Sequence, residues 1–478
     1  MTNNKKHLPH IRFNKFADGR IFVTTVFWES ILLKEDEFNE YIAGKIPEDS
    51  ELYKDLFKRW FINYDWYESE FVESYRHRFW INFLWPTLHI MILTKWCNHQ
   101  CKYCHAWATM DYENDDIKLK KEDAEKTVDI ILQSPSKYIT IEFQWWEPFS
   151  NFWIIEHIIK YTEKANKKTK KTIWYALVSN LTMLNDEILE KLFTLPNLSI
   201  STSLDWPKNV HDFNRVMSGW KNSSSYELLT ENILRIREKE KETWISILRW
   251  AMWVITKKSL PFAKEIIDTY LEFWFESIFL KRMNTIWKAE NKWNVLGYSF
   301  DDYKVFLDGY FKELLRKYKE EWIFVLDVFL SITIKKIITP DKINYVDLRS
   351  PCWAGISQIA YNHDWKVYTC DEWRMIEDDV FQLWTINDSL KDLVQSETTW
   401  IMMDASTIES LPCDVCAYAP FCWVCPVVSY MTKWNIYYNQ NNDDHCKFFT
   451  YYFDMIFRVL SDKEKYADEF SYFIKHLR

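Results

Sequence analysis

Three closely spaced cysteines are the residues of this chain with the clearest chemistry. They are Cys97, Cys101 and Cys104, in the pattern Cys-x3-Cys-x2-Cys. Three thiolates leave one iron of a [4Fe–4S] cluster open, and that iron can bind the amino and carboxylate groups of S-adenosylmethionine (SAM) and pass an electron to its sulfonium. Homolysis then yields a 5′-deoxyadenosyl radical. Tyr103, between the last two cysteines, is placed to cover the adenine.

A structural zinc site is the alternative for these cysteines. A closed tetrahedral zinc site needs a fourth ligand, which His99 or His105 would supply. The cysteines directly follow a predicted strand, and we therefore expect both histidines to be loop residues instead.

The other seven cysteines all lie after residue 350 and predict a second, separate metal region. Four of them form two Cys-x2-Cys pairs, which are also common in zinc ribbons, so a pair of zinc sites is the alternative here. A cysteine-rich, loop-like region is typical of a domain that folds around metal clusters rather than around a large core. The seven are Cys352, Cys370, Cys413, Cys416, Cys422, Cys425 and Cys446.

Tryptophan is in excess and glycine is scarce. The 478 residues include 27 tryptophans and 6 glycines, whereas average usage would give about 33 glycines. Tryptophans also stand where the backbone needs the freedom of glycine. We interpret them as glycines encoded by UGA, and expect glycine at 145, 146, 206, 274, 365 and 423. A truly tryptophan-rich protein with aromatic platforms for sugar or single-stranded nucleic acid is the alternative.

The middle of the chain alternates β-branched apolar runs with amphipathic helical stretches. This pattern predicts an α/β fold with a partial parallel (β/α)6 barrel. Such barrels carry their chemistry at the C-terminal ends of the strands, and Cys97 follows the first strand directly. The predicted strands are 87–94, 138–143, 172–179, 198–204, 245–255 and 277–280, and the helices lie near 121–134, 151–166, 185–194, 225–239 and 262–272.

Three domains are expected. Residues 1–85 hold short strand signals and a helix over 35–42, and form a small N-terminal domain. Residues 86–330 form the barrel, and residues 345–478 form the cysteine-rich domain.

Charge and hydropathy exclude several classes of protein. The net charge of −9 argues against a general nucleic-acid binder. No apolar run is long enough to span a membrane, and the polar, basic start has no apolar signal region. We expect a cytoplasmic protein.

The chain resembles the radical SAM superfamily in motifs beyond the first cysteines. Gln144-Trp145-Trp146-Glu147-Pro148 is similar to the family's Gly-Gly-Glu-Pro motif, which binds the methionine amino group, with both glycines written as tryptophan. Glycines there let the backbone approach SAM, and the carboxylate offsets its charge. Segments 201–207 and 211–215 resemble parts of radical SAM peptide maturases. The SAM contacts that the resemblance implies are Tyr103, Gln144, Trp146, Glu147, Asn180, Ser203, Arg215 and Leu280.

The seven later cysteines are similar to the SPASM extension of that superfamily. The resemblance implies two auxiliary [4Fe–4S] clusters, and the first of them can have an open iron. The last two of the middle four cysteines are separated by two residues instead of the usual three. Asp371 stands where sulfatase-maturing members carry a catalytic base; the alternative is a solvated turn residue. The implied ligand sets are Cys352, Cys370 and Cys425 for one cluster and Cys413, Cys416, Cys422 and Cys446 for the other.

Nearly the whole chain resembles the maturases of His-Xaa-Ser peptide systems. Segments 88–90, 141–144, 368–372 and 418–426 are among those that carry this resemblance. It implies a ribosomally made precursor peptide with His-Xaa-Ser repeats and a second, paired radical SAM maturase. We also expect an external electron donor, and we expect residues 1–85 to recognise the peptide.

Two other functions remain open at this point. One is a sulfatase-type maturase that oxidises a cysteine or serine to formylglycine. The other is a non-catalytic iron–sulfur protein, in which two real indoles at Trp145 and Trp146 block SAM.

Overall fold

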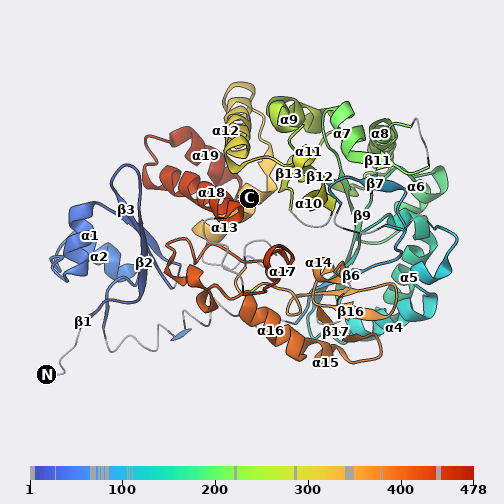
Figure 1. The fold of residues 1–478 in the computed structure, drawn as a ribbon, viewed down its shortest axis with the longest axis horizontal. Helices are drawn as coiled ribbons and strands as arrows, with labels where there is room; N and C mark the ends of the chain where they lie inside the picture. Colours follow the sequence, from blue (N-terminus) through green and yellow to red (C-terminus); the bar gives the residue numbers. More distant parts are fainter. Residues whose placement is uncertain are drawn as a thin grey trace.

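A ten-stranded sheet forms the centre of the molecule (Figure 1). The structure is a computed structural model. It describes residues 6–477 apart from 27, 65–71, 74–75, 77–79, 81–84, 105, 107, 110, 220–222, 285–287, 340–348, 377, 379–380 and 438–442. His105 and part of the predicted boundary between residues 330 and 345 therefore lie outside the described residues. The order of the strands is β14-β13-β12-β10-β9-β8-β6-β15-β16-β17.

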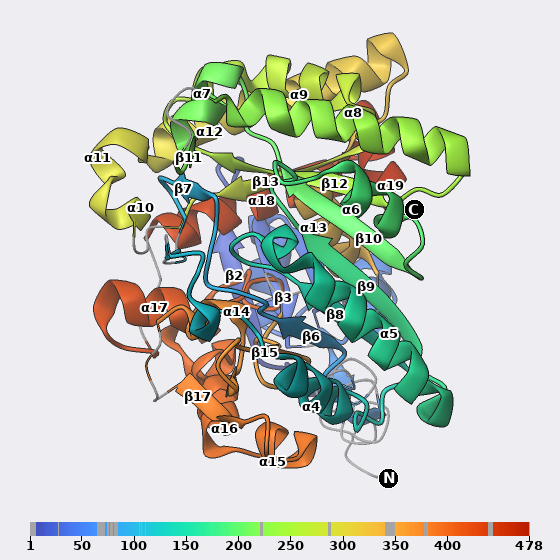
Figure 2. The same cartoon turned by 90° about the vertical axis from the view of Figure 1, so that its right-hand side faces the viewer.

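Eight neighbouring strands of this sheet run parallel, and the seven from β14 to β6 form the partial barrel. They alternate with helices, and Figure 2 shows α4, α5 and α8 along the outer side of the strands. The predicted α/β fold is confirmed, and all six predicted strands are present. The strands are β6 (Leu88–Met91), β8 (Tyr138–Phe143), β9 (Thr172–Val178), β10 (Leu198–Ser203), β12 (Leu248–Ile255), β13 (Ser277–Arg282) and the short β14 (Leu326–Asp327).

The helices between these strands bury one apolar face against the sheet. In α5, for example, Ile154, Ile155, Ile158 and Ile159 are all buried, at the spacing of one helical face. The helices are α4 (Lys121–Ile131), α5 (Phe152–Thr169), α6 (Asp186–Leu192), α7 (Lys208–Asn214), α8 (Ser225–Thr243), α9 (Ala263–Glu272), α10 (Lys288–Asn291), α11 (Trp293–Leu296), α12 (Phe300–Arg316) and α13 (Val328–Ile338).

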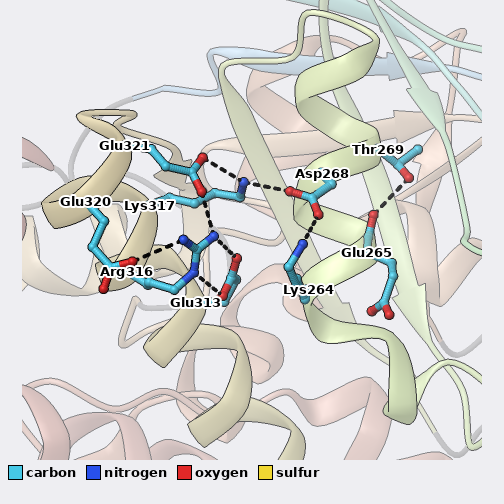
Figure 3. A network of polar contacts seen from close by, with 9 residues as sticks. All are labelled: Lys264, Glu265, Asp268, Thr269, Glu313, Arg316, Lys317, Glu320 and Glu321. Atoms are coloured by element: carbon cyan, nitrogen blue, oxygen red, sulfur yellow. Dashed lines mark hydrogen bonds and ion pairs between the residues drawn. The ribbon is translucent and has the colours of Figure 1, made fainter.

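A network of charged side chains joins α9 to the end of α12 (Figure 3). Lys317 is 5% exposed and lies 2.6 Å from Asp268 and 3.2 Å from Glu321. Asp268 also pairs with Lys264. Burial of the Lys317 amine between two carboxylates makes this contact stronger than the exposed pairs around it.

The C-terminal region continues the barrel sheet, which corrects the expectation of a loop-like domain. β15 (Gln358–Tyr361) pairs in parallel with β6, and β16 (Lys366–Tyr368) and β17 (Gln382–Thr385) follow antiparallel. These strands are too short to show a clear period in the sequence, and all four residues of β15 are buried. The helices are α14 (Asp371–Arg374), α15 (Leu390–Val394), α16 (Glu397–Ala405), α17 (Pro426–Lys433), α18 (Asp444–Ser461) and α19 (Ala467–Lys475).

The N-terminal residues form a small sheet and two helices with a core of their own. The antiparallel sheet has the order β2 (Ile11–Lys15), β3 (Ile21–Thr25), β4 (Ser30–Leu33). Helix α1 (Glu35–Ile42) has the predicted bounds, α2 (Glu51–Lys58) follows, and β1 (Lys6–His7) pairs with β5 (Asn63–Tyr64).

Tryptophans occupy most of the left-handed backbone positions. Among the described residues, twelve non-glycine residues have a positive φ, and nine of them are tryptophan. Trp244 ends α8 with φ +59° and a side chain that is 93% exposed, at a position where glycine is common. The nine include residues 145, 146, 274 and 365, as the glycine interpretation expects, but not Trp206 or Trp423. They are Trp28, Trp60, Trp145, Trp146, Trp244, Trp274, Trp322, Trp365 and Trp434.

None of the helices in the described part of the chain combines the length and the apolar composition that crossing a bilayer requires.

Candidate functional site

A cavity of about 240 Å³ lies at the C-terminal ends of the barrel strands. Cys97, Cys101 and Cys104 all line it, as the spacing predicts for one cluster site. Burial and the neighbouring thiols of Cys101 and Cys104 raise the pKa of Cys97 well above its usual value. A positively charged iron would offset the cost of ionising these thiols here. The other predicted residues on this cavity are Tyr103, Gln144, Trp146, Asn180, Ser203, Arg215 and Asp371.

A short ribbon brings Arg215 to the cysteine loop. The ribbon consists of β7 (His99–Cys101) and β11 (Arg215–Met217), and Arg215 is the partner of Cys101. The guanidinium carbon of Arg215 lies 5.3 Å from the centre of the Tyr103 ring, and its Nε lies 3.3 Å from Asp205. The Tyr103 hydroxyl donates a 2.8 Å hydrogen bond to the same carboxylate. Asp205 thus contacts two of the residues that the sequence assigned to SAM, Tyr103 and Arg215.

Glu147 lies beneath the cavity rather than on its wall, and it is fully buried. Its carboxylate accepts hydrogen bonds from Ser179 Oγ at 2.7 Å, the Asn180 backbone at 2.9 Å and the Phe149 backbone at 3.1 Å. Burial raises the pKa of Glu147 to about 7, while these three donors act in the opposite direction. In this structure Glu147 therefore holds the β8 and β9 loops together.

His99 is a strand residue, which corrects the prediction of a loop histidine. Its Nδ1 lies 2.9 Å from Asn98 Oδ1, and its Nε2 lies 2.7 Å from Ser225 Oγ. Burial and the nearby Arg215 lower the pKa of His99 to about 3, so the ring is neutral. Asn180 donates to Asn98 at 2.8 Å and so joins the same network. Both ring nitrogens of His99 are occupied by protein contacts, which argues against a zinc ligand.

Trp145 and Trp146 both line the cavity with left-handed backbones. Trp146 Nε1 is buried without a hydrogen-bond partner, and the Arg374 guanidinium lies 4.5 Å from its ring. Buried polar groups without a partner are costly. Glycine at these positions would remove that cost and widen the cavity, as the Gly-Gly-Glu-Pro resemblance implies.

Asp371 reaches the same cavity from the C-terminal region. Gln358 Nε2 donates to its Oδ1 at 2.8 Å, and Trp145 Nε1 donates to its Oδ2 at 3.0 Å. Burial and the Asp371 carboxylate raise the pKa of Glu142, on β8, to about 7. With glycine at 145 the Gln358 contact would remain, and this contact together with the place of Asp371 on the cavity favours a site residue over a solvated turn residue.

The end of β13 differs from the prediction by one residue. Leu280 is buried in the sheet, and it is Lys281, Arg282, Met283 and Asn284 that line the cavity. Successive side chains of a strand point to opposite faces, so that Leu280 packs into the core while its neighbour Lys281 reaches the cavity. Lys281 and Asp205 are polar residues of the site that the sequence did not assign, although each directly follows a predicted strand end or motif.

Comparison with known proteins identifies the part of the chain that carries this cavity. Residues 91–248 match the model of the Radical SAM superfamily. They form a radical SAM domain. Membership implies a [4Fe–4S] cluster and SAM, and the site's three thiols fit this group, because they share one cavity whose walls include Tyr103 and Arg215.

Several curated proteins are related to the radical SAM domain and its surroundings. An uncharacterized protein of Methanocaldococcus jannaschii is 28% identical over 189 residues, 40% of this chain and 60% of that protein. The radical SAM cyclopropyl synthase TigE of Paramaledivibacter caminithermalis is 24% identical over 236 residues, 45% of this chain and 49% of TigE. The cysteine-type anaerobic sulfatase-maturating enzyme of Clostridium perfringens is 23% identical over 351 residues, 70% and 88% of the two chains. The chain thus matches about half of the length of the first two.

Two solved structures share the fold. One is anSMEcpe with bound AdoMet, with a TM-score of 0.64 and 18% identity over 79% of this chain and 100% of that chain. The other is Streptococcus suis SuiB bound to precursor peptide SuiA, with a TM-score of 0.52 and 12% identity over 92% and 99% of the two chains. At these identities the likeness concerns the fold alone.

Four later cysteines line a second cavity, outside the radical SAM domain. Cys413, Cys416, Cys422 and Cys446 surround a space of about 340 Å³ together with residues of β2 and α18. Burial, followed by the thiols of Cys416 and Cys446, raises the pKa of Cys413 to about 11. These four are the ligand set that the SPASM resemblance implies.

The remaining three cysteines are buried next to α14. Cys352 and Cys370 are near enough for the charge of one to raise the pKa of the other, although burial is the main cause. Cys425 Sγ donates to Glu372 at 3.8 Å, two residues after Cys370. Within the described residues, no group of three His, Cys, Asp or Glu side chains has the arrangement of a site for a single metal ion.

Proposed function

We propose that this protein is a radical SAM peptide maturase that modifies a ribosomally made precursor peptide, one with His-Xaa-Ser repeats. The observation that carries the proposal is that Asp371 and the three cysteines line one cavity. A radical formed at the cysteines and a base at Asp371 would therefore act on a substrate bound in the same cavity. The structural neighbour SuiB, solved with its precursor peptide SuiA bound, supports a peptide as the substrate class.

The group bound by the first three cysteines, together with SAM, supplies one-electron cleavage of the sulfonium and a 5′-deoxyadenosyl radical. The residues of the chain have separate roles around it. Tyr103 covers the adenine, and Ser203 and Arg215 bind the ribose and carboxylate of SAM. The Asp205 carboxylate orients Tyr103 and Arg215. Gln144, Trp146 and Asn180 complete the wall.

Asp371 acts after hydrogen abstraction. Removal of a hydrogen atom leaves a substrate radical, and formation of the oxidised or newly bonded product then releases one proton and one electron, the electron going to a one-electron acceptor such as a proposed auxiliary cluster. The Asp371 carboxylate is oriented by Gln358 and is positioned to accept that proton. In this proposal Glu147 supports the loops and does not touch SAM.

The N-terminal sheet is proposed to recognise the precursor peptide. Its edge strand β4 contributes Ser30, Ile31 and Leu32 to a groove of about 630 Å³ that α13, α18 and α19 complete. An exposed sheet edge can accept an extended peptide as an added strand. Leu32→Asp should weaken binding of a His-Xaa-Ser precursor at least tenfold in a fluorescence titration. Ile42→Asp should not, because Ile42 is an exposed residue at the end of α1 that does not line the groove. Equal affinities would contradict this role.

Oxidation of a cysteine or serine to formylglycine is the second candidate. The position of Asp371 and the 88% coverage of the Clostridium perfringens sulfatase-maturating enzyme favour it. The two auxiliary clusters and an external electron donor belong to the proposal in either case, whereas a paired second maturase belongs to the His-Xaa-Ser candidate alone.

One experiment separates the candidates. Anaerobically reconstituted protein is given SAM, a reductant and either a His-Xaa-Ser precursor or a sulfatase-derived peptide, and both peptides are analysed by mass spectrometry. Modification of the first alone supports the proposal. Formylglycine in the second alone would replace it with the second candidate, and absence of 5′-deoxyadenosine with either would reject both.

A further inference from the structure

Two buried cations flank the cavity of the second auxiliary cysteine set, and both come from outside the cysteine-rich region. Lys336 is 3% exposed in α13, and Arg12 is 2% exposed in β2. The set itself is Cys413, Cys416, Cys422 and Cys446. Lysine and arginine are almost never fully buried unless they are paired, so each needs an anionic or polar partner.

Lys336 faces Cys422. Its Nζ donates a hydrogen bond of 3.4 Å to the Cys422 carbonyl oxygen. The Lys336 ammonium is thus buried against the backbone of one of the four proposed cluster ligands. A cluster with four thiolate ligands carries a net negative charge, and this charge would stabilise the buried ammonium in its protonated form.

Arg12 holds the opposite part of the cysteine loop. Its Nε donates to the Asp414 carbonyl and its Nη2 to the Asp414 carboxylate, between two of the cysteines in sequence. Its charge also lowers the pKa of Cys416, although burial has the larger, opposite effect. One strand further along the N-terminal sheet, Thr24 Oγ1 donates a 2.8 Å hydrogen bond to the Ala417 carbonyl. The N-terminal sheet therefore packs directly on the loop that carries Cys413 and Cys416, and Figure 1 shows α13 next to that sheet.

We propose that Lys336 and Arg12 are positioning residues that set the reduction potential of the cluster held by Cys413, Cys416, Cys422 and Cys446. The proposal rests on the ligand set given under the proposed function. Adding an electron makes the cluster more negative, and a nearby buried cation stabilises the reduced state more than the oxidised state. Arg12 belongs to the N-terminal sheet and Lys336 to α13. Two elements that supply no cysteine ligand would thus contribute to the reduction potential of the cluster.

The test is a redox titration of the full-length, reconstituted protein, followed by electron paramagnetic resonance. Lys336→Met removes the charge and keeps the length of the side chain, so it should leave the iron content unchanged. It should make reduction of one cluster at least tenfold less favourable, which is about 59 mV for a one-electron couple. Lys336→Arg restores a cation and should lie near the wild type. Lys335→Met removes the neighbouring charge on the same helix and should shift nothing.

Arg12 is tested by its own pair of variants. Arg12→Met should shift the same signal in the same direction, and Arg12→Lys should shift it less. If the Arg12 variants lose iron, the Lys336 series decides the question alone.

The outcomes distinguish this inference from the proposed function. Reduction equilibria within threefold of the wild type in Lys336→Met, with full iron content, would overturn the inference and leave the proposed function standing. If the Cys413→Ala and Cys422→Ala variants kept the full iron content, the ligand set would be rejected. The proposed cluster in this cavity and the inference about its reduction potential would both fall with it.

Discussion

Gln358 donates a hydrogen bond of 2.8 Å to Asp371 within the C-terminal region. Gln358 lies on β15, which pairs with the first barrel strand β6. The carboxylate is therefore held at the mouth of the barrel, where Cys97, Cys101 and Cys104 line the same cavity. Under the proposed function, a base from the C-terminal region would therefore act in the same cavity as a radical formed at the barrel cysteines.

Asp371→Asn tests this base. Asparagine keeps the size of the side chain but removes the basic oxygen, and the loss of a general base typically costs about 10²–10⁴-fold. We expect 5′-deoxyadenosine formation near the wild-type rate and peptide modification reduced by this factor, both measured in one anaerobic assay with a His-Xaa-Ser peptide. Full modification by the variant would remove Asp371 from the mechanism.

The first cysteines are tested by removing them one at a time. Reconstituted protein, made with glycine at the six expected positions, should bind about three [4Fe–4S] clusters. Cys97→Ala, Cys101→Ala and Cys104→Ala should each abolish reductive cleavage of SAM and keep the iron of the later cysteines. Iron analysis and chromatography of 5′-deoxyadenosine give the two readouts. Cleavage that persists in any of the three variants would contradict the radical mechanism.

The glycine interpretation predicts the residues of the native protein. Peptide mass spectra from the source organism should show glycine at 145, 146, 206, 274, 365 and 423. The structure adds residues 28, 60, 244, 322 and 434, because their backbones are left-handed. Tryptophan at these positions in the native peptides would end the interpretation.

A stability measurement tests the same idea in recombinant protein. Trp244 has φ +59° and is 93% exposed, so glycine there relieves backbone strain and removes little packing. Trp244→Gly should raise the free energy of unfolding by about 1 kcal/mol. Trp174→Gly is the control, since Trp174 lies in the middle of β9 with 52% exposure and glycine weakens a strand. Destabilisation by both variants would contradict the strain argument.

Glu142 gives a pH dependence. Its pKa in the folded protein is about 7, raised from 4.5 by burial and by Asp371. The folded state thus binds the proton more tightly than the unfolded state, so the free energy of unfolding should fall as pH rises from about 4.5 to about 7. Glu142→Gln should remove part of this fall, on the order of 1–3 kcal/mol, in urea denaturation of the cluster-free protein.

The exposed Glu48 provides the control for this titration. Glu48→Gln should leave the pH dependence as in the wild type. A smaller slope of the same sign should remain in Glu142→Gln, because burial also raises the pKa of Glu147 to about 7. Equal slopes in the wild type and in Glu142→Gln would show that Glu142 does not titrate in this range.

The sequence alone determined the parts of this protein that depend on local pattern. The spacing of Cys97, Cys101 and Cys104 defined a three-thiolate site, and alternating apolar runs located the six barrel strands. Both are properties of residues close together in the chain. The same local pattern missed β15, because four buried residues show no period, and it placed Leu280 on the cavity instead of Lys281.

Only the tertiary structure decided which distant residues meet. It brought Asp371 to the first cysteines, occupied both nitrogens of His99, and placed Glu147 beneath the cavity. It also buried Arg12 and Lys336 beside the later cysteines. These contacts depend on strand order and on the packing of separate elements, and the free energy that selects them comes from burial across the whole core rather than from any short stretch of sequence.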